Sequence, residues 1–298
     1  MDKKVLEIIN LNKRYGDKRI LSNANMTVYE GDIYGFVGKN GAGKTTLMKT
    51  CLGITNKESG EIKFFNSTNY NKRKKVGALI ENPALYEEVS ARKNMELYAT
   101  IFGEGKREID EILKMVGLSE HSNRKVKKFS LGMKQRLGIA IALLNSPKFL
   151  ILDEPINGLD PEGIAEIRKI IIDLNRKEKI TFLISSHLLD ELGKIATRYG
   201  FIANGTIEEM KAEELQEKCK NTLCIETSSD KTNQLFEDFN KKYRELEPKV
   251  NNNIIEMRYV EETVPGIARY MNKNNYNIYS IFPKKESLEK YFLERVGK

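Results

Sequence analysis

Glycines, a lysine and a hydroxyl group follow one another closely between residues 38 and 46. The run fits the spacing GxxxxGK[ST] of a phosphate-holding loop, and it reads Gly38, Lys39, Asn40, Gly41, Ala42, Gly43, Lys44 and Thr45. Glycines let backbone N–H groups converge on an anion at a helix N-terminus. Lys44 would place its charge on the β- and γ-phosphates, Thr45 would bind Mg²⁺, and Thr46 would reach the α-phosphate. The loop predicts binding of ATP or a related nucleoside triphosphate with magnesium.

Two adjacent carboxylates are candidates for the second half of this site. Asp153 and Glu154 follow the apolar run of residues 149–152, which predicts a buried strand. Ligands bind at the carboxyl ends of strands in open α/β sheets, so Asp153 is placed to hold magnesium through water. Glu154 would then lie within reach of a water molecule in line with the γ-phosphate. We assign it as the general base, a role typically worth about 10² to 10⁴-fold in rate.

The elements that must position these residues alternate between strands and helices. A short strand over 33–37 ends directly at the glycine-rich loop, and a helix is expected to begin near Lys44. The remaining apolar patterns predict strands over 4–11, 26–29, 76–80, 149–152 and 181–185, and helices over 131–144 and 164–174. Such alternation predicts an α/β fold with a largely parallel, covered sheet.

A third motif separates the classes of phosphate-loop protein. Residues 129–136 read Phe-Ser-Leu-Gly-Met-Lys-Gln-Arg and open an amphipathic helix thirteen residues before the strand of Asp153. This motif resembles the signature of ABC ATPases, and the order of motifs matches that family over about residues 4–210. The resemblance implies a P-loop NTPase fold of ABC type, with a mixed sheet core, an antiparallel β subdomain and a helical insertion. It also implies that Ser130 and Gly132 face the γ-phosphate of ATP on an opposing subunit.

The same resemblance implies roles for three further residues. Asp160, in Gly-Leu-Asp-Pro, resembles the D-loop aspartate, which crosses the dimer and helps to orient the attacking water. His187 follows the strand of residues 181–186 and resembles the switch histidine that contacts the γ-phosphate. Tyr15 lies upstream of the loop, where the family has an aromatic ring that stacks on adenine.

Glu81 departs from the family pattern. It follows the strand of residues 76–80, where the family normally has a glutamine that ligates magnesium and senses the membrane partner. A carboxylate can also ligate magnesium, but it adds negative charge beside the γ-phosphate and Glu154. We expect Glu81 to keep the metal and coupling roles. Leu131 and Met133 also depart from the usual signature, which leaves Ser130 and Gly132 intact.

The departures point to one branch of the family. Glu81, the run of residues 78–86 (ALIENPALY) and the signature variant SLGMKQR together resemble ABC exporters of bacitracin and lantibiotic self-protection. The run of residues 287–292 (SLEKYF) also resembles the tail of these proteins. The transported substrate is not readable from the chain, because substrate contacts would belong to the permease.

Composition limits the remaining alternatives. The 298-residue chain is 40% hydrophobic, and its apolar runs fall short of the about 18 to 20 residues that cross a bilayer. The N-terminus lacks the apolar core of a signal peptide, so we expect a cytoplasmic protein held at the inner membrane face by its permease. Basic residues give a net charge of +8 but alternate with acidic ones, so no nucleic-acid partner is expected. The three cysteines lack the clustering of a zinc site.

We expect two domains, an ABC ATPase domain over 1–219, with a helical subdomain over about 84–145, and an accessory α/β domain over 220–298. The predicted function is the ATP-hydrolysing subunit of a membrane exporter, which dimerises as a homodimer or heterodimer around two Mg-ATP and drives a separate permease. A soluble ABC ATPase acting on DNA or ribosomes is the alternative, although the chain has neither a second motor domain nor zinc modules. A GTPase would need an NKxD element, and a small-molecule kinase would leave Ser130, Asp160 and His187 unexplained.

Overall fold

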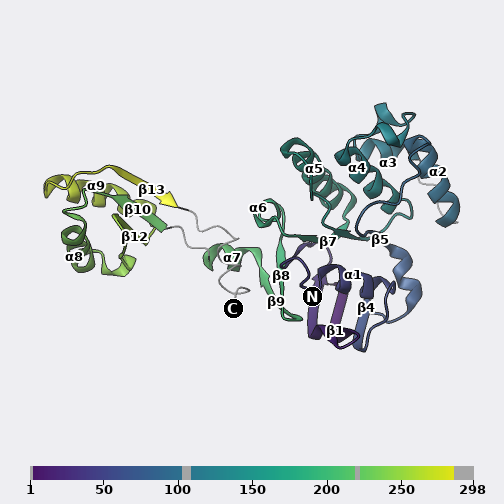
Figure 1. Cartoon of the computed structure of the whole chain (residues 1–298), viewed down its shortest axis with the longest axis horizontal. Helices are drawn as coiled ribbons and strands as arrows, with labels where there is room; N and C mark the ends of the chain where they lie inside the picture. Colours follow the sequence, from purple (N-terminus) through teal and green to yellow (C-terminus); the bar gives the residue numbers. More distant parts are fainter. Residues whose placement is uncertain (1–2, 103–108, 219–221, 285–298) are drawn as a thin grey trace. The chain divides into compact units, whose positions relative to one another are not determined.

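The chain divides into two compact units in the computed structural model, which describes residues 3–102, 109–218 and 222–284. The units are Met1–Ala212 and Glu213–Lys298. The boundary expected at 219/220 lies outside the described residues, and the contacts divide the chain after Ala212. Figure 1 shows the first unit in purple to green and the second in green to yellow.

A six-stranded mixed sheet forms the centre of the first unit. Its order is β5-β6-β7-β3-β8-β9, with the first five strands parallel and β9 antiparallel to β8. The strands are β3 (Ile33–Val37), β5 (Val76–Leu79), β6 (Phe149–Asp153), β7 (Thr181–Ser186), β8 (Arg198–Ala203) and β9 (Thr206–Lys211). Every residue of β3, β6 and β7 is buried, as expected for strands covered on both faces. The mixed α/β sheet predicted from the sequence is confirmed.

A three-stranded antiparallel sheet of order β2-β1-β4 packs against this centre. It consists of β1 (Lys4–Tyr15), β2 (Lys18–Tyr29) and β4 (Ser59–Phe64). The first two strands run longer than the expected 4–11 and 26–29, because they form a hairpin that closes where Tyr15 pairs with Lys18. The two-residue turn contains Gly16 at a φ of 53°, a conformation that glycine adopts easily. This sheet is the antiparallel β subdomain.

Helices connect the strands of the central sheet. They are α1 (Lys44–Leu52), α4 (Leu131–Ala142), α5 (Pro161–Glu178) and the short α6 (Leu189–Leu192). Helix α1 begins at Lys44, as the sequence predicts, and ends at Gly53 in the left-handed conformation. Helix α5 begins after Asp160, whose carboxylate accepts a hydrogen bond from Gly163 N, with Pro161 in its first turn.

The helical insertion contains α2 (Ala91–Phe102) and α3 (Ile109–Met115), which pack with α4. Figure 1 shows these three helices grouped at one side of the unit. The buried Asn94 amide bonds to the backbone of Tyr86 in both directions, which fixes the chain that enters the insertion. Gly103 and Gly105, which interrupt the helical pattern of the insertion in the sequence, lie outside the described residues. Short 3-10 turns occur at Tyr70–Lys75, Ser119–His121 and Val126–Lys128.

The second unit has the element order βαββαβ after helix α7 (Ala212–Lys218). The elements are β10 (Thr222–Glu226), α8 (Thr232–Lys242), β11 (Lys249–Asn251), β12 (Ile254–Arg258), α9 (Val264–Lys273) and β13 (Ser280–Lys284), with 3-10 turns at Arg244–Leu246 and Glu261–Thr263. The sheet order β11-β12-β10-β13 and antiparallel pairing give a ferredoxin-like arrangement. The tail segment 287–292 lies outside the described residues.

No described helix is both long enough and apolar enough to span a membrane.

Candidate functional site

The glycine-rich loop lies between the end of β3 and the start of α1. Gly43 precedes α1 at a φ of 110°, and no side chain caps the first turn of the helix. The first turn contains no acidic residue, so its N–H groups can receive an anion. A Cβ atom on Gly38 would lie 2.5 Å from Cγ2 of Ile202, so only glycine fits that position. Lys39, Asn40 and Gly41 are exposed at the crest of the loop, with Ala42 half-buried behind them.

The Lys44 side chain turns back under this loop. Its Nζ atom donates a hydrogen bond to Gly38 O at 2.7 Å and lies 3.3 Å from Glu154 Oε1. The side chain is 6% exposed. The acidic and carbonyl partners hold this buried ammonium group where phosphate oxygens would approach.

Thr45 and Asp153 meet at the edge of the sheet. Thr45 Oγ1 donates to Asp153 Oδ2 at 2.6 Å, and Ser185 Oγ donates to Asp153 Oδ1 at 2.5 Å. The Ser185 oxygen also accepts a hydrogen bond from Glu154 N at 2.9 Å. Strands β6 and β7 place these groups together, because Asp153 and Ser185 are register partners. Thr46 follows in the first turn of α1 and is half-buried.

Glu154 connects Lys44 with His187. Its Oε2 atom lies 2.8 Å from His187 Nδ1, while its buried Oε1 atom accepts no hydrogen bond within the described residues. Glu154 adopts a φ of 49°, a left-handed conformation that costs on the order of 1 kcal/mol for a residue with a Cβ atom. Such strain turns the carboxylate away from the line of β6 and toward the glycine-rich loop. The arrangement can accept a proton at Glu154.

Glu81 lies just beyond β5 and pairs with Lys49 of α1, whereas Glu154 lies beside Lys44 of the same helix. Its Oε1 atom accepts a hydrogen bond from Lys49 Nζ of α1 at 2.6 Å. This bond raises the pKa of the Lys49 ammonium above its ordinary value, and burial opposes the rise. Glu81 has a φ of 61° and a side chain that is 61% exposed.

Tyr15 ends β1, and its side chain is 48% exposed. The Nζ atom of Lys13 lies over the ring, 4.5 Å from its centroid, and donates to Asn56 O at 2.5 Å. Lys13 itself is only 9% exposed. One face of the ring therefore has a fixed cation, which strengthens the ring as a stacking platform.

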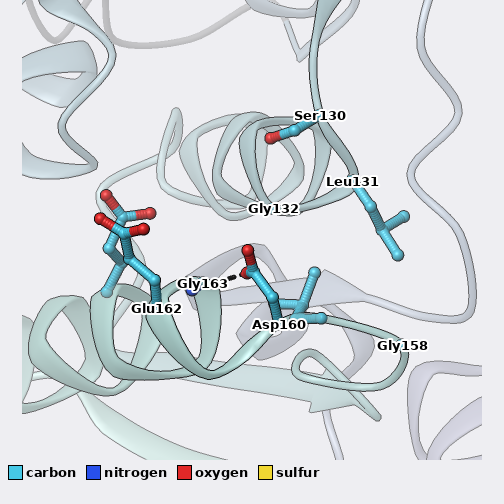
Figure 2. A pocket seen from close by; sticks show the side chains of 9 residues that line it. Ser130, Leu131, Gly132, Gly158, Asp160, Glu162 and Gly163 are labelled. Carbon is cyan, nitrogen blue, oxygen red and sulfur yellow. Dashed lines mark hydrogen bonds between the residues drawn. The ribbon is translucent and has the colours of Figure 1, made fainter.

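Ser130, Gly132 and Asp160 line a separate cavity of about 370 Å³ between the starts of α4 and α5. Figure 2 shows Ser130 at the start of one helix and Asp160 at the start of the other. Ser130 Oγ accepts from Met133 N at 3.2 Å, and Asp160 Oδ1 accepts from Gly163 N at 3.0 Å. Each side chain caps its own helix, so two positive helix ends meet at one opening.

The structure adds three residues that the sequence analysis missed, namely Lys13, Lys49 and Ser185. Ser185 lies two residues before His187 in a strand already identified, so its position gave a usable signal. Lys49 gave none, because its partner Glu81 lies 32 residues away in the chain. Lys13 lies two residues before Tyr15 in the same strand, but its anchor at Asn56 O is 43 residues away.

Comparisons with known proteins agree with this geometry. The family described as ABC transporter matches residues 21–157. The lantibiotic transport ATP-binding protein SrtF of Streptococcus pyogenes is 46% identical over 228 residues, which cover 74% of this chain and 99% of SrtF. The bacitracin transport ATP-binding protein BcrA of Bacillus licheniformis is 36% identical over 98% of this chain and 97% of its own length. The chain belongs to the ABC transporter ATP-binding proteins.

The fold comparison agrees with this family. The structure of cbiO1 from Clostridium perfringens, described as part of an ABC transporter complex, has a TM-score of 0.67 at 25% identity. The match covers 82% of this chain and 97% of that one. The ABC ATPase fold and ATP binding by the cassette are therefore established for this chain, which is an ABC transporter ATPase.

The residues of this ABC ATPase fit Mg-ATP. Within the described residues, no three His, Cys, Asp or Glu side chains gather into an all-protein metal site. Magnesium in nucleotide sites is held by one or two carboxylates together with substrate phosphates, and Thr45 with Asp153 supplies that donor set. The uncapped start of α1 can receive phosphate oxygens. Glu154 Oε1 lies 3.3 Å from Lys44 Nζ but accepts no hydrogen bond within the described residues, so it can accept one from a water molecule.

The two cysteines of the described residues are free and buried. Burial raises the pKa of the Cys51 thiol to about 12, so this thiol stays protonated at neutral pH. Cys219 lies outside the described residues.

Proposed function

We propose that this ABC ATPase is the ATP-hydrolysing subunit of a membrane exporter that gives resistance or immunity to an antimicrobial peptide or another drug. The observation that carries the proposal is the joint presence of the Lys44, Glu154 and His187 cluster and near full-length similarity to a bacitracin transport protein. SrtF, named for lantibiotic transport, supports the same substrate class.

Lys44 and the first turn of α1 bind the phosphates of ATP, and Thr46 reaches the α-phosphate. Thr45 and Asp153 would hold a magnesium ion, whose charge would neutralise the phosphate oxygens. Glu154 accepts a proton from a water molecule while the oxygen of that water bonds to the γ-phosphorus. The bond between the γ-phosphorus and the β-phosphate oxygen breaks, and ADP leaves with that oxygen. His187, fixed by Glu154 at 2.8 Å, donates a hydrogen bond to the γ-phosphate. Tyr15 stacks on the adenine.

The cavity of Ser130, Gly132 and Asp160 completes the site of a second subunit. Two helix N-termini attract the γ-phosphate of ATP that is held by the opposing chain, and Asp160 helps to orient the water there. ATP then joins the two subunits as a homodimer or as a heterodimer with a related chain. Closing and reopening of this dimer would drive the permease.

Coupling to the permease is assigned to Glu81 and to the segment 84–105, of which the structure describes residues 84–102. Tyr86, Tyr98 and Phe102 form a series of rings with centroids 6.2 to 6.3 Å apart, and Tyr86 and Phe102 are largely exposed. Exposed aromatic rings of this kind are enriched at protein interfaces. A permease bound there would hold the ATPase at the inner face of the membrane.

Purification from solubilised membranes tests the proposal. The tagged chain should recover a multi-spanning protein, and a Tyr86→Ser, Phe102→Ser variant should recover at least tenfold less. A charge-neutral control, Thr55→Ser, should recover as much as the parent chain. Recovery of no multi-spanning protein, together with ATPase activity stimulated by DNA or ribosomes, would contradict it.

A further inference from the structure

A second cavity lies at the opposite end of the central sheet from the nucleotide site. It encloses about 260 Å³ and is lined mainly by lysines, namely Lys3, Lys4, Lys72, Lys75, Lys148 and Lys179. Glu30 is the one acidic residue in the lining. Asp153 ends β6 at the catalytic edge, whereas Lys148 directly precedes the same strand at this edge. We call this lining the lysine pocket.

The backbone that supports the lysine pocket is fixed by the sheet. Lys75 and Lys148 each directly precede a core strand, and Lys148 N donates to Lys75 O at 2.9 Å. Thr181 N at the start of β7 donates in turn to Lys148 O at 3.0 Å. Three neighbouring strand starts therefore hold Lys75 and Lys148 at one opening, although the two lysines are 73 positions apart along the chain.

The positive charge of the lysine pocket is poorly compensated. Lys3 pairs with Glu30 at 3.6 Å, and Lys4 pairs with Glu7. Across the described ranges, the other four lysines of the lining take part in no ion pair. Six ammonium groups with two partner carboxylates, Glu30 and Glu7, leave a net charge of about +4 around a concave surface, and concave surfaces focus the electric field. Such mutual repulsion is relieved when an anion enters.

The remaining lining residues include a turn with left-handed backbone and two apolar residues. Phe65 and Asn66 form a two-residue turn after β4 with φ values of 52° and 58°, and Lys179 has a φ of 57°. Left-handed backbone is uncommon for residues with a Cβ atom, and for a bulky residue such as Phe65 it is an outlier that calls for an explanation. Val5 and Phe65 add an apolar wall beside the ammonium groups.

We propose that the lysine pocket binds a small phosphate-bearing anion, in which a phosphate ester or diphosphate meets the four unpaired lysines and the organic part meets Val5 and Phe65. Lysine ammonium groups suit phosphate because each donates up to three hydrogen bonds as a compact charge. The ligand is either a free phosphate ester or the phosphate of a lipid headgroup. This site is separate from the nucleotide site and does not depend on the proposed export function.

Titration of the full chain with inorganic pyrophosphate tests the site. Lys44→Ala in every sample weakens binding at the nucleotide site, so that the lysine pocket dominates the calorimetric signal. The parent should bind one pyrophosphate per chain with a saturable curve. Replacing the four unpaired lysines with glutamine should raise the Kd at least tenfold; the changes are Lys72→Gln, Lys75→Gln, Lys148→Gln and Lys179→Gln.

A charge-matched control separates a built pocket from general surface charge. It replaces four exposed lysines elsewhere with glutamine, at Lys18, Lys114, Lys169 and Lys241. This control should keep the parent Kd within twofold. Equal weakening in both variants, or no saturable binding in the parent, would overturn the proposal. Equal thermal midpoints in the two variants would show that a loss of binding is not a loss of folding.

Vesicles distinguish the two sources of phosphate. The parent chain is sedimented with phosphatidylcholine vesicles that contain about one fifth phosphatidic acid, and with pure phosphatidylcholine vesicles. If the parent and the control variant sediment with the acidic vesicles and the pocket variant does not, the ligand is a lipid headgroup. Pyrophosphate binding without such retention assigns a free phosphate ester.

Discussion

The edge of the central sheet and the cavity of Figure 2 both present polar groups to solvent, but they are organised differently. At the sheet edge, side chains from separate elements join in one network that runs from Thr45 through Asp153 and Ser185 to Glu154 and His187. At the cavity, Ser130 and Asp160 each bond only to the helix that follows them.

This difference indicates how each region meets a phosphate. The sheet edge brings together Lys44, the proposed proton acceptor Glu154 and the proposed magnesium ligands Thr45 and Asp153, so under the proposal it is a nearly complete catalytic group. The cavity has no cation among its lining residues but three carboxylates, Asp160, Glu162 and Glu166, so its positive potential comes from the two helix N-termini. Such a cavity suits a phosphate group that is already bound by its own nucleotide site before it reaches the cavity. The following variants test whether the two regions act separately.

Glu154→Gln should have the largest effect, because it removes the proton acceptor at the sheet edge and leaves the phosphate contacts. Turnover should fall by about 10² to 10⁴-fold in a phosphate-release assay. The same variant should accumulate an ATP-dependent dimer in size-exclusion chromatography. Glu120→Gln, at an exposed position of the insertion, should keep the parent rate. Unchanged turnover in Glu154→Gln would disprove the assignment of the base.

Ser130→Arg should affect the cavity alone, because an arginine side chain fills the opening between α4 and α5. The Kd for ATP should stay within twofold of the parent, while turnover falls on the order of 10²-fold. Introduced into Glu154→Gln, it should abolish the ATP-dependent dimer. Ser119→Arg, on the surface of the insertion, serves as control. A raised Kd for ATP would mean that the two regions are not separate.

Ser185→Ala should loosen the network at the sheet edge. It removes the donor to Asp153 Oδ1 and the acceptor for Glu154 N, so the free energy of unfolding should fall by about 1 to 3 kcal/mol. Denaturant titration measures this change. Ser186→Ala is the matched control, since Ser186 Oγ accepts one bond from Leu188 N and does not touch Asp153. A larger fall in the free energy of unfolding for Ser186→Ala than for Ser185→Ala would contradict the stabilising role of the Ser185 hydrogen bonds.

Lys13→Met should have the smallest effect, because it removes a cation behind the Tyr15 ring while leaving the ring in place. A cation and ring pair contributes about 0.5 to 1 kcal/mol at such sites, so the Kd for ATP should rise roughly two- to fivefold. Tripolyphosphate, which has no base to stack, should bind as before. An equal rise in the Kd for ATP and for tripolyphosphate would show that Lys13 acts on the phosphates and not through Tyr15.

Much of the nucleotide site could be predicted because its residues follow one another along the chain. The run from Gly38 to Thr45 and the pair Asp153 and Glu154 stand at strand ends that an apolar pattern reveals. Partners from distant segments could not be predicted in this way. Lys49 and Glu81 meet because α1 and the end of β5 lie together in the fold, and no local pattern encodes that approach.

The fold shows the same limit. Buried parallel strands such as β6 and β7 are continuous apolar runs and were expected with nearly correct bounds. Strands β8 and β9 were not expected. Strand β9 is mostly exposed, and its sequence Thr-Ile-Glu-Glu-Met-Lys has no clear alternation of apolar and polar residues. The pairing of β10 with β12 and β13 also depends on distant segments.

The left-handed backbone at Glu154 has a consequence for the evolution of this ATPase. Glycine would adopt a φ of 49° without steric cost, so the substitution that relaxes the backbone most would also delete the proton acceptor. A search for variants of higher thermal stability would therefore be drawn toward inactive enzymes at position 154 if Glu154 is the base proposed above, and the glutamate persists there under selection for turnover.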